Sequence, residues 1–143
     1  MDSHAGQCVD FHLCYFPAFG YFALRANTTG EHNIGIGNGA VNGCDTESHN
    51  LAIGVDSMHG SINGGEYNVA IGNNSLDALT SGDTNVAIGY NAASAATTTT
   101  NSVYIGANVA ATGVTTGNQN TVVGAESGSA LTSGQTNTVF GPY

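Results

Sequence analysis

The chain has 143 residues and a net charge of -9, with ten acidic residues against a single basic one, Arg25. This composition excludes the clustered Lys and Arg that phosphate binding needs, and an anionic membrane surface would repel the chain. No apolar run approaches the length of about 20 residues that crosses a bilayer. We therefore expect no nucleic-acid partner and no membrane insertion.

The segment 1–27 contains no repeat and is rich in aromatic side chains. The aromatic residues in the stretch from residue 10 to residue 22 are Phe11, Tyr15, Phe16, Phe19, Tyr21 and Phe22. Such a cluster would aggregate if it were left in water. Two roles remain open for residues 1–27: a cap on the first unit of the following repeat, or an anchor that uses aromatic hot spots to bind a partner. We favour the anchor, because a cap needs fewer large rings.

This first segment also lacks the basic stretch and clean apolar core of a secretory signal peptide. The expected place of synthesis is therefore the cytoplasm of a host cell. Cys8, Cys14 and Cys44 form no Cys-x-x-Cys pair and no zinc-ligand spacing, so we expect plain thiols and no disulfide framework.

From residue 28 to residue 143 the chain repeats a short cassette typified by Asn-Val-Ala-Ile-Gly. Each copy ends in a glycine, and the step from one glycine to the next is nearly constant: Gly37, Gly54, Gly72, Gly89, Gly106, Gly124 and Gly141. A period held this tightly is the signature of stacked coils. The sequence predicts an all-β fold, a parallel β-solenoid or β-roll of about seven coils of 17–18 residues.

Within each cassette, the residues one and three positions before the glycine are mostly β-branched, and all are aliphatic except Thr121, Thr138 and Phe140. They share one face of a strand, and this face is the predicted core. The position directly before the glycine holds Ile36, Ile53, Ile71, Ile88, Ile105, Val123 and Phe140. Leu76, Leu79 and Leu131, which follow later in their coils, are expected to add to the core.

The position between these two columns points to the opposite face and is also apolar. It holds Ala52, Ala70, Ala87, Tyr104, Val122 and Val139. A strand that is apolar on both faces is expected to be covered on both faces. We predict that this second column packs against sister chains in a homotrimer.

Two further columns predict the turns. The position seven before the cassette glycine is also glycine, except at Glu47 and Thr99, and its Thr/Ser-Gly contexts suggest turns with positive φ. A short return strand is expected after each cassette.

At the position four residues before the cassette glycine, most copies have asparagine. Its amide either forms a hydrogen-bonded ladder from coil to coil or supports a turn, and both roles are structural.

The polar residues show no pattern typical of a metal site or of a catalytic site. His32 and His49 lie one period apart, but Tyr67 and Thr84 interrupt this column, so we predict no metal site and no cofactor. The acidic pairs Asp45–Glu47 and Asp77–Asp83 have no partner base. The threonines at 97–100 belong to a turn rather than to an ordered ice-binding array. We predict no catalytic residue and no enzymatic activity.

The cassettes Asn85-Val86-Ala87-Ile88-Gly89 and Asn101-Ser102-Val103-Tyr104-Ile105-Gly106 resemble the head repeats of trimeric autotransporter adhesins. The longer unit at residues 72–89 is similar to repeats in fibre and surface proteins of tailed-phage virions. This resemblance covers residues 28–141 and implies a trimer of β-rolls. Adhesin heads use a shorter coil, and from this sequence we expect no coiled-coil stalk and no membrane anchor.

These observations lead to one functional hypothesis and one alternative. The chain is expected to be a structural protein on the surface of a phage virion, docked to a capsid or tail protein through residues 1–27. Its solenoid would decorate or cement the capsid or form a short tail fibre, with a host surface glycan as a further candidate partner. The alternative is the head of a bacterial trimeric autotransporter adhesin.

Overall fold

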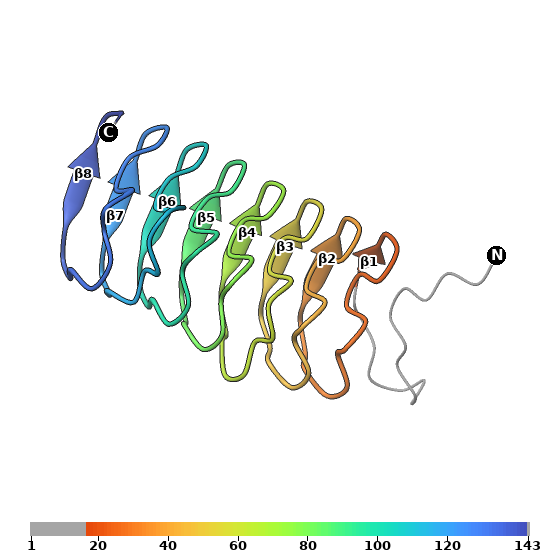
Figure 1. The fold of residues 1–143 in the computed structure, drawn as a ribbon. Coiled ribbons are helices and arrows are strands. Elements are labelled where there is room, and N and C mark those ends of the chain that lie inside the picture. The colour runs from red at the N-terminus through yellow and green to blue at the C-terminus, as the bar shows by residue number, and fades with distance from the viewer. Residues whose placement is uncertain (1–16, 143) are drawn as a thin grey trace.

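A computed structural model describes residues 17–142 of the chain. Its strands are β1 (Ala18–Phe19), β2 (Ile34–Ile36), β3 (Leu51–Ile53), β4 (Val69–Ile71), β5 (Val86–Ile88), β6 (Val103–Ile105), β7 (Thr121–Val123) and β8 (Thr138–Phe140). Neighbouring strands pair in parallel and in chain order, forming one sheet along the side of a rod of stacked coils (Figure 1). The predicted all-β parallel solenoid of about seven coils is confirmed.

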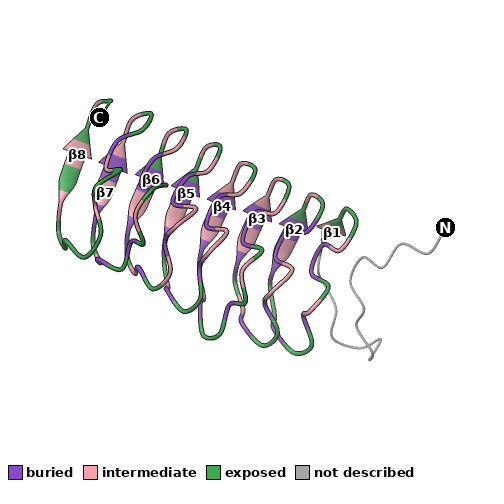
Figure 2. Ribbon diagram, in the orientation of Figure 1, coloured by how far each residue is buried: buried purple, intermediate pink, exposed green. Residues whose placement is uncertain are grey.

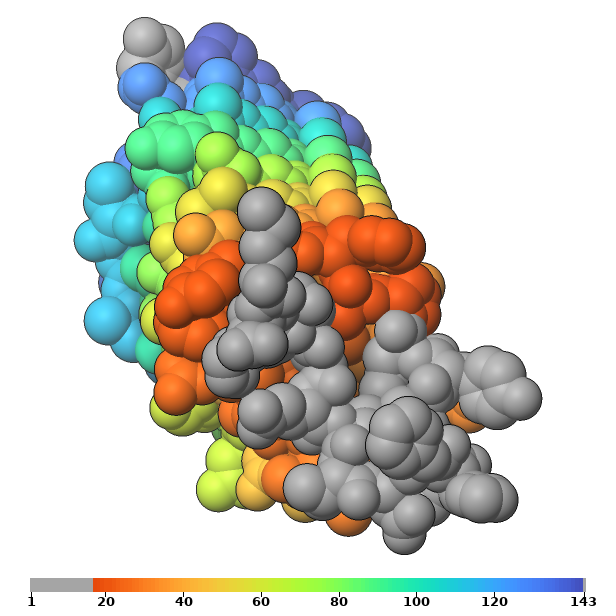
Figure 3. All heavy atoms as spheres, turned by 90° about the vertical axis from the view of Figure 1, so that its right-hand side faces the viewer, coloured from red at the N-terminus to blue at the C-terminus, as the bar shows by residue number. Residues whose placement is uncertain are grey.

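Pairing between coils is in register at the cassette. Ala52, for example, lies opposite Gly35 in one neighbouring coil and opposite Ala70 in the other. Equivalent atoms therefore line up in columns that run from one end of the rod toward the other (Figure 3). The predicted return strand is wrong for the described residues, in which each coil contributes one short strand. Outside these strands, one isolated parallel bridge joins Ala96 to Thr115.

The repeat extends upstream of residue 28. Strand β1 pairs with β2, and the amide of Gly37 donates to the carbonyl of Phe19 at 2.7 Å. Gly20 has a φ of 135°, nearly the same as the 136° of Gly37 one period later. Of the predicted aromatic anchor, Phe19, Tyr21 and Phe22 thus belong to the first coil. Phe11, Tyr15 and Phe16 lie outside the described residues.

The two faces of the strands are the reverse of the prediction. The column expected between sister chains lies inside its own coil: Ala52, Ala70, Ala87, Tyr104 and Val122 are fully buried, and Val139 is partly buried (Figure 2). The column expected to form the core lies on the outside. Its members Ile36, Ile53, Ile71, Ile88, Ile105, Val123 and Phe140 are half-buried or exposed.

The reason for this reversal is the small cross-section of so short a coil. The interior is filled by a column four positions after each cassette glycine, which begins Leu24, Val41, Met58 and Leu76 and then shrinks to Ala93, Ala110 and Gly128. A Cβ at Gly35 would lie only 3.2 Å from Cγ of Leu24, whereas a Cβ at Gly128 would lie 2.9 Å from Val122. Where one of these two columns carries large side chains the other carries small ones, because the space between them does not hold two large side chains in one coil.

Leu76 and Leu79 are fully buried, as predicted, and Leu131 is partly buried. The enlargement of the strand column at Tyr104 and Val122 therefore balances the shrinking of the facing column. It does not mark a surface between chains.

Left-handed backbone conformations recur three times in each coil. In one coil they fall at His49, Asp56 and Met58, with φ between 52° and 63°. Each of these amides donates to a neighbouring coil: His49 to the carbonyl of Glu31 at 2.9 Å, Asp56 to that of Asn38 at 2.8 Å, and Met58 to that of Ser75 at 2.9 Å. A left-handed residue other than glycine costs about 1–2 kcal/mol. The hydrogen bonds along the axis offset this cost.

The glycine seven before each cassette glycine is needed for a different reason from the one predicted. Gly30, Gly65, Gly82, Gly117 and Gly134 do not have positive φ. Instead, a Cβ on Gly82 would collide with the carbonyl of Thr99, and a Cβ on Gly117 with that of Gly134. Glycine permits this close approach of successive coils. The two exceptions, Glu47 and Thr99, each come just before one of the longer coils.

The column of asparagines is a buried ladder. Oδ1 of Asn50 accepts the backbone N–H of Asn68 at 3.0 Å, and Oδ1 of Asn68 accepts that of Asn85 at 2.9 Å. The side-chain amide of Asn68 meanwhile donates to the carbonyl of Gly82 at 2.9 Å. The two roles left open by the sequence are therefore combined in one side chain, which joins successive coils and also holds the turn of the next one.

The ladder tolerates one replacement. Ser102 occupies the position in its coil, and its Oγ accepts the backbone N–H of Asn120 at 3.1 Å. The acceptor toward the next coil is thus kept, whereas the amide donor to the turn is lost. Thr99 in the turn compensates, because its hydroxyl donates to the carbonyl of Gly117 at 2.8 Å.

We expect Asn68→Ala to lower the free energy of unfolding by about 2–6 kcal/mol, because it leaves the buried N–H of Asn85 and the carbonyl of Gly82 without partners. Asn68→Ser keeps an acceptor, as Ser102 does, and should cost less. Denaturant unfolding followed by circular dichroism measures both. Asn63→Ala, at an exposed position, is the control, and an equal cost for it would contradict the role of the ladder.

Candidate assembly and binding surfaces

The outward side of the sheet is an apolar surface, here called the outer sheet face. It consists of the residues one and three before each cassette glycine, such as Val69 and Ile71 in β4 or Val86 and Ile88 in β5. Ile36, Ile88 and Ile105 remain 36–37% exposed. In β1 to β8, no residue of this face is charged. The chain therefore presents a continuous uncharged strip along a strongly acidic rod.

Each end of the outer sheet face carries a phenylalanine. Phe19 in β1 is 64% exposed and Phe140 in β8 is 72% exposed. Both occupy the column that holds isoleucine or valine between them. Exposed aromatic rings at both ends make the strip a candidate contact surface rather than a set of scattered apolar residues.

A second aromatic group lies beside it in the first coil. Tyr21 is 58% exposed, and its ring centroid lies 3.8 Å from that of Phe22. The guanidinium of Arg25 lies 4.3 Å from the Phe22 centroid, a cation–π contact. Arg25 is the only Lys or Arg in the sequence, so this aromatic end differs in charge from the rest of the rod.

The histidine column forms a short exposed stack. His32 and His49 have ring centroids 4.8 Å apart, and those of His49 and Tyr67 are 4.6 Å apart. In the described part of the chain, no group of three or more His, Cys, Asp or Glu side chains is arranged to hold a metal ion. The stack follows from the register of the coils and provides aromatic contacts along the axis.

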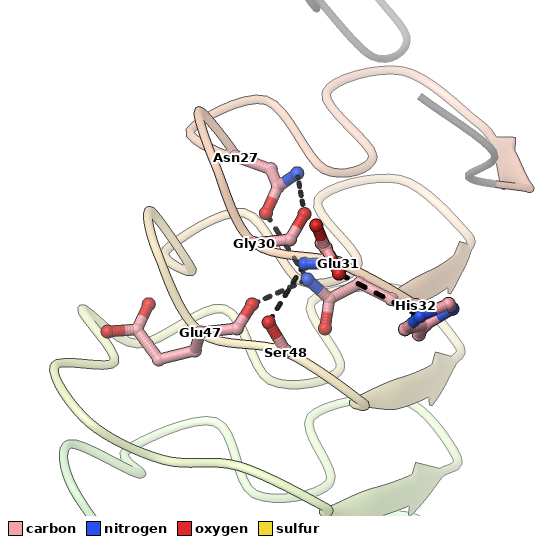
Figure 4. Close-up of polar contacts among 7 residues, drawn as sticks. Asn27, Gly30, Glu31, His32, Glu47 and Ser48 are labelled. Carbon is pink, nitrogen blue, oxygen red and sulfur yellow. Dashed lines mark hydrogen bonds and ion pairs between the residues drawn. The ribbon is translucent and has the colours of Figure 1, made fainter. Parts of the chain in front are cut away.

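Glu47 replaces a turn glycine and clamps two coils. Its carboxylate accepts the N–H groups of Asp45 at 2.9 Å and Thr46 at 3.1 Å in its own coil, and that of Gly64 at 2.9 Å in the next. Its backbone carbonyl accepts the amide of Asn33 at 2.7 Å (Figure 4). Burial acts to raise the pKa of Glu47, but hydrogen bonds from Gly64 and from the turn outweigh it and lower the pKa.

Two other titratable groups respond mainly to burial. The Cys44 thiol is buried, and burial together with the nearby Glu47 charge raises its pKa, so the thiol stays protonated and unreactive. Burial also raises the pKa of Asp77, with Asp56 adding to the effect and His59, 3.9 Å away, opposing it. Of the acidic residues considered from the sequence, Glu47 clamps two coils and Asp77 lies beside His59.

Comparisons of the chain with protein-family models, with curated proteins and with solved structures find no match. Across residues 17–142, no helix combines the length and the apolar character that a membrane crossing requires.

The lowered pKa of Glu47 predicts a pH dependence of stability. Its contribution is fully present above the pKa of the unfolded chain, about 4.3, and is lost as the pH falls through the lower folded pKa. Glu47→Gln should therefore destabilise the protein at pH 6 and much less at pH 2.5. Urea unfolding of both proteins at the two pH values tests this. A difference in stability that does not change with pH would show that the clamp does not depend on charge.

Proposed function

We propose that the chain is a structural protein of a phage virion that displays a homotrimeric β-solenoid on the particle surface. The observation that carries this proposal is the outer sheet face, an uncharged apolar strip that follows the whole length of an acidic rod. Strips of this extent are uncommon on monomers and mark contact surfaces. The resemblance of the cassettes to phage fibre and adhesin head repeats supports a display role.

Sister copies are the partners that this face fits best. Its side chains recur once per coil, so a parallel copy with the same coil spacing repeats the same contacts along the entire rod. Between residues 17 and 142 the acidic residues lie outside the strands, as at Asp45, Glu66 and Asp83. Repulsion between copies is therefore kept away from the contact. Three copies arranged about one axis bury their outer sheet faces together.

The aromatic end supplies the attachment to the particle. Tyrosine and arginine, as at Tyr21 and Arg25, are enriched among interface hot spots, and phenylalanine, as at Phe22, is enriched in interface cores. The three residues lie in the first coil and belong to the predicted anchor segment, residues 1–27. The partner is a capsid or tail protein, and the solenoid projects from it as a decoration, a cement or a short fibre. A host surface glycan is a further candidate partner.

The alternative is the head of a bacterial trimeric adhesin, in which the same trimer would stand on a stalk. The outer sheet face favours a trimer in both cases, so the test that separates them is attachment to a phage particle. Neither role requires a cofactor or catalysis.

A charged residue introduced on the outer sheet face tests whether this face forms the contact between the three copies. We expect the wild-type chain to sediment with a mass near three times its 14.4 kDa. Ile71→Glu should yield folded monomers, because three carboxylates would be brought together at the trimer axis. Thr84→Glu, at an exposed position outside the face, should leave the trimer intact. A monomeric wild-type chain, or a trimer that tolerates Ile71→Glu, would refute the proposed interface.

Attachment is tested by two tyrosines at the same position of different coils. Tyr21 and Tyr90 each follow a cassette glycine and are 58% and 55% exposed. We expect Tyr21→Ala to lower the number of copies per purified phage particle by at least about tenfold, as loss of a hot spot does, whereas Tyr90→Ala leaves it unchanged. Quantitative mass spectrometry of particles provides the measurement. Equal incorporation of both variants would reject the anchor.

A further inference from the structure

The chain contains three Asn-Gly steps, at Asn38–Gly39, Asn42–Gly43 and Asn63–Gly64. In such a step the backbone nitrogen of the glycine attacks the side-chain carbonyl carbon of the asparagine, because no Cβ on the second residue obstructs the approach. The product is a five-membered succinimide ring, and the side-chain nitrogen leaves as ammonia. The surroundings of each step decide whether this ring forms in the folded chain.

Asn63–Gly64 is the most open of the three steps. It belongs to the turn of a longer coil, and both of its residues are exposed. A Cβ added to Gly64 would meet no heavy atom within 4 Å, and the φ of this glycine is 103°. The N–H of Asn63 donates to the carbonyl of Thr80 at 2.5 Å, which holds one side of the step on the next coil. The turn is therefore fixed in place but has room around Gly64 for a ring.

Glu47 supplies a fixed proton acceptor for this step. Its Oε1 accepts the N–H of Gly64 at 2.9 Å, whereas its Oε2 accepts those of Asp45 and Thr46 at 2.9 and 3.1 Å. The two bonds to Oε2 hold the carboxylate in the orientation that directs Oε1 at Gly64. A general base must lie within about 2.6–3.2 Å of the atom whose proton it removes. Because the N–H donates in the plane of the peptide, the face of the nitrogen stays free for attack.

The other two steps have different surroundings. The N–H of Gly39 donates to the backbone carbonyl of Tyr21 at 2.9 Å, and a carbonyl is too weak a base to take the proton. At Asn42–Gly43, a Cβ on Gly43 would collide with the carbonyl of Gly60, so the next coil lies against the step and leaves no room for the ring. The stacking of the coils therefore favours reaction at one step out of three.

We propose that the folded chain modifies itself at Asn63, with Glu47 as the general base. Oε1 of Glu47 takes the proton from the nitrogen of Gly64 as this nitrogen forms its bond to Cγ of Asn63. The bond from Cγ to Nδ2 then breaks, and Nδ2 keeps the electron pair, takes the proton back from Glu47 and leaves as ammonia. Solvent water opens the ring at either carbonyl and gives aspartate or isoaspartate. The ring has no N–H at Gly64, so Glu47 loses its hydrogen bond to the next coil while the ring persists.

The test follows the three asparagines of the full chain by peptide mass spectrometry. The protein is incubated at pH 7.5, either folded or in concentrated urea, and conversion is read from the change in mass when a side-chain amide becomes a carboxyl group. In the folded chain we expect Asn63 to convert faster than it does in urea, and Asn38 and Asn42 to convert more slowly than in urea. Glu47→Gln should slow the conversion of Asn63 at least about tenfold in the folded chain and leave its rate in urea unchanged.

Glu31→Gln is the matched control, since it removes an exposed carboxylate in the preceding coil and should leave the rate at Asn63 unchanged. The proposal is overturned if Asn63 converts no faster in the folded chain than in urea, or if it converts as fast in Glu47→Gln as in wild type. The comparison of folded with unfolded wild type needs no substitution, so it decides the question even where Glu47→Gln loosens the turn. The measurement concerns a single residue of the chain, so failure here is distinguishable from failure of the proposed trimer or of its attachment.

Discussion

The buried asparagine ladder is the interaction on which the rest of the structure depends. An acceptor on one coil receives a backbone N–H of the next, so the cassettes must superpose to within the length of a hydrogen bond. The extra residue of each longer coil is consequently accommodated away from the ladder, within the turns. Ser102 shows that the acceptor toward the next coil is the feature that the position requires. When the asparagines of successive coils are in register, the other positions of those coils are aligned as well.

Strict stacking makes the interior narrow, and this determines the chemistry of the surface. A coil that encloses an asparagine and a large side chain facing the strand has room only for glycine or alanine at the middle of most strands. The β-branched residues on either side must then point outward, where they form the outer sheet face. The apolar strip is therefore a direct consequence of the coil dimensions, and in the proposed trimer sister copies would cover it.

The period, the parallel register and the number of coils were predictable, because the regular spacing of the glycines and asparagines determines them. The side toward which each column points was not, because both faces of the strands are apolar and residue size was a misleading guide: Ala87 is inside and Ile88 outside. The first coil was missed because Ala18-Phe19-Gly20 lacks the asparagine.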